Sequence, residues 1–273
     1  MKYTDLHVHS TFSSDGHSTI IEHCERALAL GLRGVAFTEH YDAMTSNPWG
    51  PRAMDGRAFY TEHSATARQA VMEAQERYSG RLDVIYAIEL GQPYEDPQRS
   101  CEFLDAHDFD FVLGSIHNVE DGTDYYYVDY DKVDIDRLFD TYYRNHLRLI
   151  EFGRIDSIGH LDYPVRVLEK YLPKPATMLA YRDVAVEVAR AAAQAGIPLE
   201  INTRGLFRWF DRLTPEDWVL KAYREFGGEA VTLGSDGHTA DAMGLGLDVA
   251  AARAEQFGLR VITGFKNHIP SFD

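Results

Sequence analysis

Cysteine, long hydrophobic runs and basic residues are all scarce in this sequence. The two cysteines, Cys24 and Cys101, have no CxxC spacing, so we expect reduced thiols rather than a disulfide. No run of about 18 apolar residues is present, and no basic stretch is followed by an apolar run near the first residue. Neither a membrane helix nor a signal peptide is predicted, and we expect a cytoplasmic protein.

Acidic residues outnumber basic ones by 43 to 27, which gives a net charge of −16. Such a chain repels a phosphate backbone, and no run of Lys or Arg overrides that field, so a nucleic acid partner is not expected. Bound divalent cations would reverse the sign locally and attract a small anion. The hydrophobic content of 45% is normal for a globular protein with a sizeable core.

Strand-like and helix-like segments alternate along the chain. Short apolar runs are followed by longer segments in which apolar residues recur near the helical period. This alternation predicts an α/β fold with a parallel sheet, closed as a barrel or doubly wound, in a single domain over residues 1–273. The predicted strands cover residues 3–9, 34–40, 82–90, 109–117, 155–162, 197–202 and 230–236, and the predicted helices cover 19–30, 57–78, 133–152, 177–195, 215–226 and 247–257.

Two long segments between these elements are predicted to be loops. Residues 45–56 contain Pro, Gly and Asn, and residues 119–131 are rich in Tyr and Asp. Loops of this length often carry function. For the Tyr- and Asp-rich segment, a solvated loop is favoured over a lid on a ligand.

The stretch DLHVH at residues 5–9 places two histidines two positions apart. In a β-strand, residues i and i+2 project to the same side, so the imidazoles of His7 and His9 can converge on one metal ion. A polar strand face with two unrelated histidines is the alternative.

Residues that can bind a metal stand at the end of every predicted strand. In α/β barrels the segments after the carboxyl ends of the strands build the active site, and the preceding apolar runs form core. The alternative is that these residues merely face solvent at the rim of the barrel. It would require His, Asp or Glu to occur by coincidence at the ends of seven successive strands. In strand order these residues are His7 and His9, Glu39 and His40, Glu89, His117, His160 and Asp162, Glu200 and Asn202, and Asp236 with His238.

The number of imidazoles and carboxylates exceeds what one tetrahedral zinc ion can use, so more than one metal ion is predicted. Imidazole combined with carboxylate suits Zn, Mn or Fe. No cysteine stands at a predicted strand end, which argues against a structural thiolate site.

Six motifs resemble the PHP (polymerase and histidinol phosphatase) family, in order over nearly the whole chain: DLHVH at 5–9, TEH at 38–40, IEL around Glu89, GSIH at 114–117, GHLD at 159–162 and SDGH at 235–238. GSIH, GHLDYP, EINTRGL and GSDGH resemble the stand-alone histidinol-phosphatase branch more than the domain attached to DNA polymerases. The resemblance implies a distorted (β/α)7 TIM-like barrel that holds three divalent ions of Zn, Mn or Fe. By motif position it implies the metal ligands His7, His9, Asp15, His40, Glu89, His117, His160, Asp236 and His238.

Two positions depart from the pattern of the family. Asp15 stands where many members have a histidine, so the ion that it serves is expected to bind less tightly or to be of a harder type. Glu39 replaces the Asp that is common in the T-D-H motif of the family, and its implied role is to orient His40 from behind.

The resemblance also implies candidates for substrate binding. Arg166 follows GHLDYP, and Asn202 and Arg208 lie in EINTRGLFR at 200–208. An arginine can give two parallel hydrogen bonds to phosphate. For Arg166 a helix-flanking surface position is the alternative, and for His17, a further substrate candidate, the alternative is a cap or a support for a ligand. Arg204 stands where small residues are usual in this branch, and its head is expected in solvent.

The implied activity is the hydrolysis of a small phosphomonoester, which in this branch is L-histidinol phosphate. The hypothesis is that a hydroxide bridging the metal ions attacks phosphorus in line and that Asp236 orients this hydroxide. Arg166 and the ions would stabilise the charge on the transferred group. Asp162, Glu200 or an acidic residue of the 120–131 segment is the candidate to bind the histidinol amine.

Three other functions remain open. A PHP phosphoesterase for another small phosphomonoester, such as a nucleotide, would use the same site. A catalytically silent metal-binding module would have no reason to keep a complete set of ligand residues. A metal-dependent amidohydrolase shares the barrel and an early HxH, but it generally has a lysine between its metals, and no Lys stands at a predicted strand end.

Overall fold

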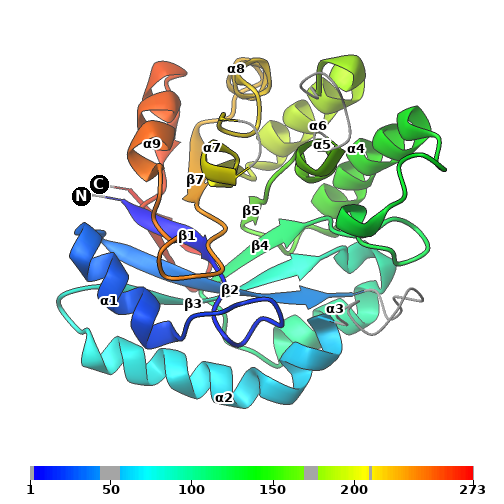
Figure 1. The fold of residues 1–273 in the computed structure, drawn as a ribbon. Helices are drawn as coiled ribbons and strands as arrows, with labels where there is room; N and C mark the ends of the chain where they lie inside the picture. Colours follow the sequence, from blue (N-terminus) through cyan, green and yellow to red (C-terminus); the bar gives the residue numbers. More distant parts are fainter. Residues whose placement is uncertain (1–2, 44–55, 169–177, 209–210, 273) are drawn as a thin grey trace.

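A curled sheet of eight parallel strands forms the centre of the molecule (Figure 1). The computed structural model describes residues 3–43, 56–168, 178–208 and 211–272, except for the side chains of residues 56–59 and 208. The strands pair in chain order, as expected for successive βαβ units. They are β1 (Thr4–Val8), β2 (Gly34–Asp42), β3 (Asp83–Gly91), β4 (Phe111–Ser115), β5 (Ser157–Ile158), β6 (Leu199–Asn202), β7 (Ala230–Gly234) and β8 (Arg260–Val261).

The first strand, β1, approaches the segment that follows β7, the penultimate strand of the sheet. Val8 of β1 forms a parallel bridge with Gly237. The Asp236 N–H donates to the His7 carbonyl at 2.8 Å, and the His9 N–H donates to the Gly237 carbonyl at 3.0 Å. The predicted α/β fold with a distorted TIM-like barrel is therefore confirmed. The short eighth strand, β8, was not predicted.

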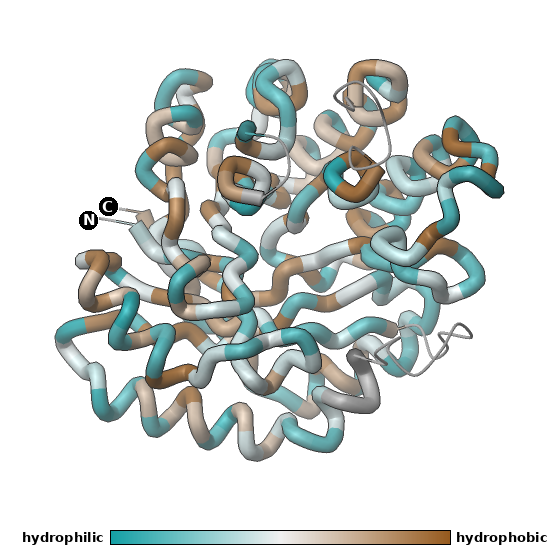
Figure 2. Tube along the Cα trace, in the orientation of Figure 1, coloured by the Kyte–Doolittle hydropathy of each residue, from teal (hydrophilic) through white to brown (hydrophobic). Residues whose placement is uncertain are grey.

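Helices cover the outside of the sheet (Figure 1). Figure 2 shows hydrophobic and hydrophilic residues alternating along these outer helices, as expected when one face of a helix packs on a core. Within the described ranges, no helix has the length and apolar composition needed to cross a membrane. The helices are α1 (Ile20–Leu30), α2 (Gly56–Arg77), α3 (Pro97–Asp105), α4 (Ile135–Phe152), α5 (Tyr163–Leu168), α6 (Arg182–Ala195), α7 (Arg204–Arg208), α8 (Asp217–Glu225) and α9 (Leu247–Gln256), with 3₁₀ turns at η1 (Pro93–Glu95), η2 (Tyr125–Tyr127) and η3 (Met178–Tyr181).

Helix α1 shows how local sequence sets the ends of an element. Thr19 and Glu22 form a capping box, in which each side chain accepts a hydrogen bond from the backbone N–H of the other residue. The helix ends at Gly31, whose φ of 65° lies in the left-handed region that glycine adopts without strain. The helix therefore begins and ends within about one residue of the predicted 19–30. The predicted 45–56 loop lies almost wholly outside the described residues.

Along the strands, apolar residues fill the lower part of the barrel, and polar residues stand at the carboxyl ends, which form the upper part. In β3, Ile85 and Ala87 belong to a cluster inside the barrel, and Glu89 follows them at the same parity. In β4, Phe111 and Leu113 lie in the same cluster, and His117 follows beyond the strand. Because alternate residues of a strand share a face, the packed lower interior fixes the direction in which the polar residues point.

A hairpin of β9 (Gly264–Lys266) and β10 (Ile269–Ser271) adds to the lower interior. Phe265 of β9 is buried and its ring stacks on that of Phe111 at 4.5 Å between centroids. The His268 N–H donates to the Asp110 carbonyl at 3.0 Å. The hairpin, which was not predicted, therefore contributes to the core at the end of the barrel opposite the polar residues.

Candidate metal centre and active site

Glu89 lies at the centre of a buried group of histidines. Its Oε1 is 3.1 Å from His117 Nε2 and 2.9 Å from His160 Nε2. Its Oε2 is 2.9 Å from His40 Nδ1. Burial opposes the charge of this carboxylate, but the neighbouring His7 and His117 outweigh it, so the pKa of Glu89 lies well below its usual value. The carboxylate is therefore ionised, as a metal ligand must be.

The two histidines of the DLHVH stretch converge, as the period of a strand predicts. His7 Nε2 and His9 Nε2 are 3.0 Å apart, and each is 3.4 Å from Glu89 Oε2. Burial, together with the neighbouring His40, lowers the pKa of His9 well below its usual value, so its ring is neutral. Two ring nitrogens that face each other beside a carboxylate form a donor set that a cation would satisfy.

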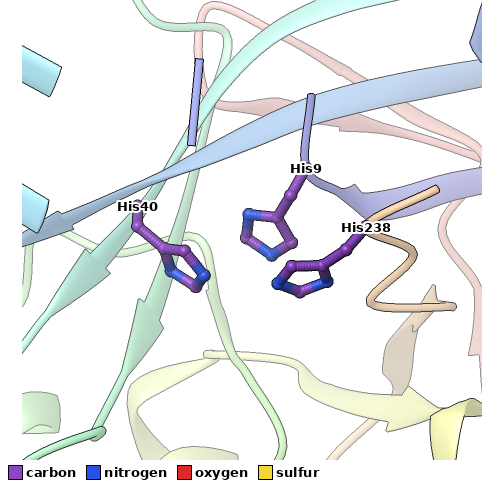
Figure 3. A group of neighbouring side chains, drawn as sticks. All are labelled: His9, His40 and His238. Atoms are coloured by element: carbon purple, nitrogen blue, oxygen red, sulfur yellow. The ribbon is translucent and has the colours of Figure 1, made fainter. Parts of the chain in front are cut away.

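A third group of ligand atoms lies nearer to solvent. Figure 3 shows the rings of His9, His40 and His238 turned toward one another. His9 lies 4.1 Å from His40 and 4.3 Å from His238 between ring centroids. Asp15 Oδ2 is 2.9 Å from His238 Nε2, and Asp15 Oδ1 is 3.6 Å from His40 Nε2. The Asp15 side chain is 40% exposed, so this group opens toward the cavity described below.

Asp236 connects this outer group to the β1 histidines. Its Oδ1 is 3.9 Å from His7 Nε2, 3.7 Å from His9 Nε2 and 3.5 Å from His238 Nδ1. Its backbone has φ of 53°, which is uncommon for a residue other than glycine and is found at functional sites. Gly234, two residues before Asp236, stands where the backbone closely approaches other side chains. A Cβ at this position would lie 2.0 Å from Glu200 Oε1 and 2.5 Å from the His7 Cβ.

All nine predicted ligands meet in one place, although they come from six strand ends. Ligand atoms of eight of them form four overlapping sets of three, within each of which the atoms lie no more than 4.8 Å apart. The ninth, Asp15, adjoins these sets through its contacts with His40 and His238. Because the sets share His7, His9, His40 and Glu89, they describe a continuous centre rather than separate sites. The sets are His7, His9 and Glu89; His40, Glu89 and His117; His7, His160 and Asp236; and His9, His40 and His238.

Glu200 supports two of these histidines from behind. Its Oε1 accepts from His7 Nδ1 at 2.7 Å, and its Oε2 accepts from the His160 N–H at 2.7 Å. A proton held on His7 Nδ1 leaves Nε2 free to face the centre. On the opposite side, Asp42 Oδ1 lies 2.8 Å from His117 Nδ1 and fixes that ring in the same way. Sequence reasoning did not assign these supporting roles, because no local pattern pairs residues so far apart.

The expected role of Glu39 is different in the structure. Its carboxylate accepts hydrogen bonds from the hydroxyls of Ser10 and Ser13 rather than from the His40 ring. Ser13 Oγ in turn lies 3.2 Å from His9 Nδ1 and accepts from the His40 backbone N–H at 3.1 Å. Glu39 therefore holds Ser13, and Ser13 holds His9.

The structure places the two arginines near Asp236 differently. Arg166 is fully buried, and its Nη1 lies 3.3 Å from Asp236 Oδ2. Arg204 lines the cavity, with its Nη1 3.3 Å from Asp236 Oδ1 and 2.8 Å from His238 Nδ1. The expectation that the head of Arg204 lies in solvent is therefore wrong. The reason is that α7 begins directly after β6 and brings residue 204 beside the Asp236 turn.

Asn202, His17 and Arg208 complete the predicted substrate residues. Asn202 is buried, donates from Nδ2 to Glu200 at 3.1 Å, and accepts at Oδ1 from the Arg204 backbone N–H at 3.0 Å. It thereby connects the carboxylate behind His7 to the start of α7. His17 lies on the cavity wall. Arg208 ends α7, but its side chain lies outside the described residues, so its role stays a prediction.

A cavity of about 770 Å³ opens above the metal-ligand candidates. The segment favoured as a solvated loop forms one wall of it, because Asp124, Tyr126 and Tyr127 line the cavity. This segment folds back on the end of β4, where the Tyr125 N–H donates to the His117 carbonyl at 2.9 Å. The lid-like alternative is therefore closer to the structure. A volume of this size accommodates a small organic molecule.

The fold and these side chains define an α/β barrel protein with a centre of imidazoles and carboxylates that could hold several metal ions, beneath a cavity for a small ligand. The chain belongs to the PHP domain family, whose model matches residues 5–204. It is 29% identical to a histidinol-phosphatase from Lactococcus lactis, over 97% of this chain and 95% of the relative. It is 25% identical to a probable histidinol-phosphatase from Thermotoga maritima, over 94% of each chain.

A solved structure with the same fold is similar to this one over its whole length. It is a histidinol phosphate phosphatase from Lactococcus lactis in complex with zinc, L-histidinol and phosphate. The TM-score is 0.79, the sequence identity is 24%, and 99% of each chain is covered.

Proposed function

We propose that this protein is a metal-dependent phosphomonoesterase that hydrolyses L-histidinol phosphate to L-histidinol and phosphate. The observation that carries the proposal is the convergence of all nine candidate ligands, six of which line the cavity beside an arginine. Near full-length similarity to histidinol-phosphatases supports the choice of substrate. We further propose that the whole chain forms one catalytic domain, because ligands from β1 and from the segment after β7 belong to the same centre.

The donor set fits divalent metal ions. Imidazole nitrogens and ionised carboxylates converge there, and no thiol takes part among the described side chains, which suits Zn, Mn or Fe. We propose three ions, because the nine candidate ligands, with Asp15 included, exceed the eight positions that two tetrahedral ions offer. When bound, such ions lower the pKa of a coordinated water and neutralise the charge of a phosphate.

The residues of this chain have separable proposed roles. Asp236 reaches both the buried and the outer ligand groups, which supports its proposed role of orienting the attacking oxygen. Arg204 presents a guanidinium to the cavity and is the proposed contact for phosphate oxygens. Arg166 holds the other oxygen of the Asp236 carboxylate, and its predicted direct contact with the phosphate stays a proposal. These two arginines would stabilise the charge that develops on the transferred phosphoryl group.

Substrate preference tests the proposal directly. Phosphate release from L-histidinol phosphate should be compared with release from AMP, a sugar phosphate and p-nitrophenyl phosphate, with protein reconstituted separately with Zn, Mn or Fe. We expect kcat/KM for L-histidinol phosphate to exceed the others about 100-fold or more, which corresponds to roughly 3 kcal/mol of selective transition-state binding. Equal low rates on all four substrates would contradict the proposed substrate but not the metal centre.

Two substitutions test the assignment of the centre. Asp236→Asn should lower kcat by about a thousandfold or more while leaving the circular dichroism spectrum unchanged, because it removes a ligand charge and the orienting oxygen. Asp248→Asn is the matched control, since Asp248 is exposed in the first turn of α9. Full turnover and unchanged metal content in the Asp236→Asn protein would refute the assignment.

A further inference from the structure

Five aspartates line the cavity, and they differ in whether their carboxylates pair with a histidine or an arginine. Asp15 pairs with His238, Asp42 pairs with His117, and Asp236 contacts two arginines. Asp241 is exposed to solvent, which weakens any ion pair that it makes. The remaining carboxylate is Asp124, which is only partly exposed.

Two hydrogen bonds hold the Asp124 carboxylate in place, and both go to the same oxygen. The Tyr126 N–H donates to its Oδ1 at 2.7 Å, and the Tyr163 hydroxyl donates to the same oxygen at 2.9 Å. Oδ2 accepts no hydrogen bond from a residue that the structure describes. Burial raises the pKa of Asp124 above its usual value despite the opposing effect of His117, so a cation bound beside it would further stabilise its ionised form.

Tyr163 sets the distance between Asp124 and the metal-ligand candidates. Its ring packs against the rings of His117 and His160, at 5.6 and 5.3 Å between centroids, and its hydroxyl reaches Asp124. One tyrosine side chain therefore separates the anion-binding end of the site from a carboxylate. Tyr126 and Tyr127 lie on the same wall, and aromatic faces attract organic cations.

The other acidic residues that sequence reasoning considered for an amine do not face the cavity. Glu200 and Asp162 are each 2% exposed and are not among the residues of the cavity wall. Both oxygens of Glu200 are already engaged with His7, His160 and Asn202. Of the earlier alternatives, the 120–131 segment is therefore the one that reaches the ligand space.

We propose that Asp124 is the specificity-determining residue that binds the cationic group of the substrate, so that the site selects phosphomonoesters carrying an amine or imidazolium a few bonds from the phosphate. The inference rests on the proposed phosphomonoesterase function. It adds that Asp124 binds the end of the substrate opposite the phosphate. The charge of the wall complements such a substrate: Arg204 and the metal centre take its anionic end, and Asp124 takes its cationic end.

Asp124→Asn is a clean test because both local hydrogen bonds go to one oxygen. The amide oxygen of Asn can keep the bonds from Tyr126 and Tyr163, while the negative charge is lost. Asp121→Asn is the matched control, because Asp121 lies in the same segment, is exposed and does not line the cavity. Both variants and the wild type are assayed with L-histidinol phosphate, O-phosphoethanolamine and p-nitrophenyl phosphate.

We expect Asp124→Asn to raise KM for the two amine-bearing substrates about tenfold or more, with KM for p-nitrophenyl phosphate changed less than about threefold and metal content unchanged. The control should resemble the wild type on all three substrates. An equal loss on all three substrates, or no change on any, would overturn the assignment of Asp124. If the wild type hydrolyses O-phosphoethanolamine but not L-histidinol phosphate, and Asp124→Asn removes that preference, the inference stands and the proposed substrate fails.

Discussion

Replacing Glu200 with Gln tests whether the residues that hold the candidate ligands from behind determine their affinity for metal ions. Glu200 is buried and receives three donors on two oxygens: His7 Nδ1 at 2.7 Å, the His160 N–H at 2.7 Å and Asn202 Nδ2 at 3.1 Å. Gln has the same shape but offers one oxygen and one NH₂ group. Its NH₂ group must therefore face a donor, whichever way the amide is turned.

Each orientation of the amide has a definite consequence. If the NH₂ faces His7, the His7 proton must move to Nε2, where it blocks the nitrogen that faces the centre. If the NH₂ faces His160, a buried backbone N–H loses its acceptor. Losing a charge-assisted bond and stranding one buried donor should lower the free energy of unfolding by about 2–4 kcal/mol. Metal affinity should fall about 10- to 100-fold, the usual effect of losing the partner behind a ligand.

Two measurements on metal-free protein check these magnitudes. Zn or Mn affinity is obtained by competition with a chromophoric chelator, and stability is obtained by urea unfolding followed by tryptophan fluorescence. Glu102→Gln is the matched control, because Glu102 is exposed on α3 and its carboxylate accepts a hydrogen bond from the neighbouring Gln98 side chain. Metal affinity within about twofold of wild type in Glu200→Gln would refute the view that Glu200 fixes the His7 tautomer.

Three further predictions follow from buried groups. Gly234→Ala should lower both metal affinity and thermal stability, because its Cβ would lie 2.0 Å from Glu200 Oε1; unchanged melting and metal content would contradict the close approach. Burial lowers the pKa of His146 to about 3, so its contribution to stability is complete above pH 6.5 and is lost as the pH falls. Metal-free wild type should therefore lose about 2 kcal/mol more unfolding free energy between pH 7 and pH 5 than His146→Gln, and parallel pH profiles from urea unfolding would count against it. Burial also raises the pKa of the Cys24 thiol to about 12, so at pH 8.5 mass spectrometry should detect iodoacetamide labelling at the partly exposed Cys101 well before Cys24; equal labelling rates would argue against this burial.

Eight of the nine candidate metal ligands stand at or just after strand ends, and their convergence could be predicted because a barrel turns the order of strands in the sequence into an order in space. Asp15 was implied by the family resemblance alone. Each strand carries its polar residues at its carboxyl end, and a parallel barrel brings all of those ends to one edge. His7 and Asp236 are far apart in the sequence, yet the topology alone predicts that they meet. The ligand set therefore needed only the strand pattern and the family resemblance.

The supporting contacts were beyond the reach of sequence reasoning. Glu39 was expected to contact His40, but the side chain turned to Ser10 and Ser13, because those hydroxyls lie within its reach once β1 and β2 are paired. Arg204 was expected in solvent, since no pattern in the sequence shows that α7 starts beside the Asp236 turn. The short strands β8, β9 and β10 have two or three residues each, too few for a periodic signal.

The sequence by itself determined the alternation of strands and helices and the imidazoles and carboxylates at the strand ends, and hence a candidate metal centre, because periodicity and topology are properties of the chain. Only the tertiary structure decided which carboxylate lines the cavity and which is buried in hydrogen bonds to a histidine. Asp124 lies in the segment after β4 and Glu200 lies in β6, and what distinguishes the two carboxylates is the set of donors that packing brings to each. Those donors come from distant parts of the chain, so their geometry exists only once the barrel has formed.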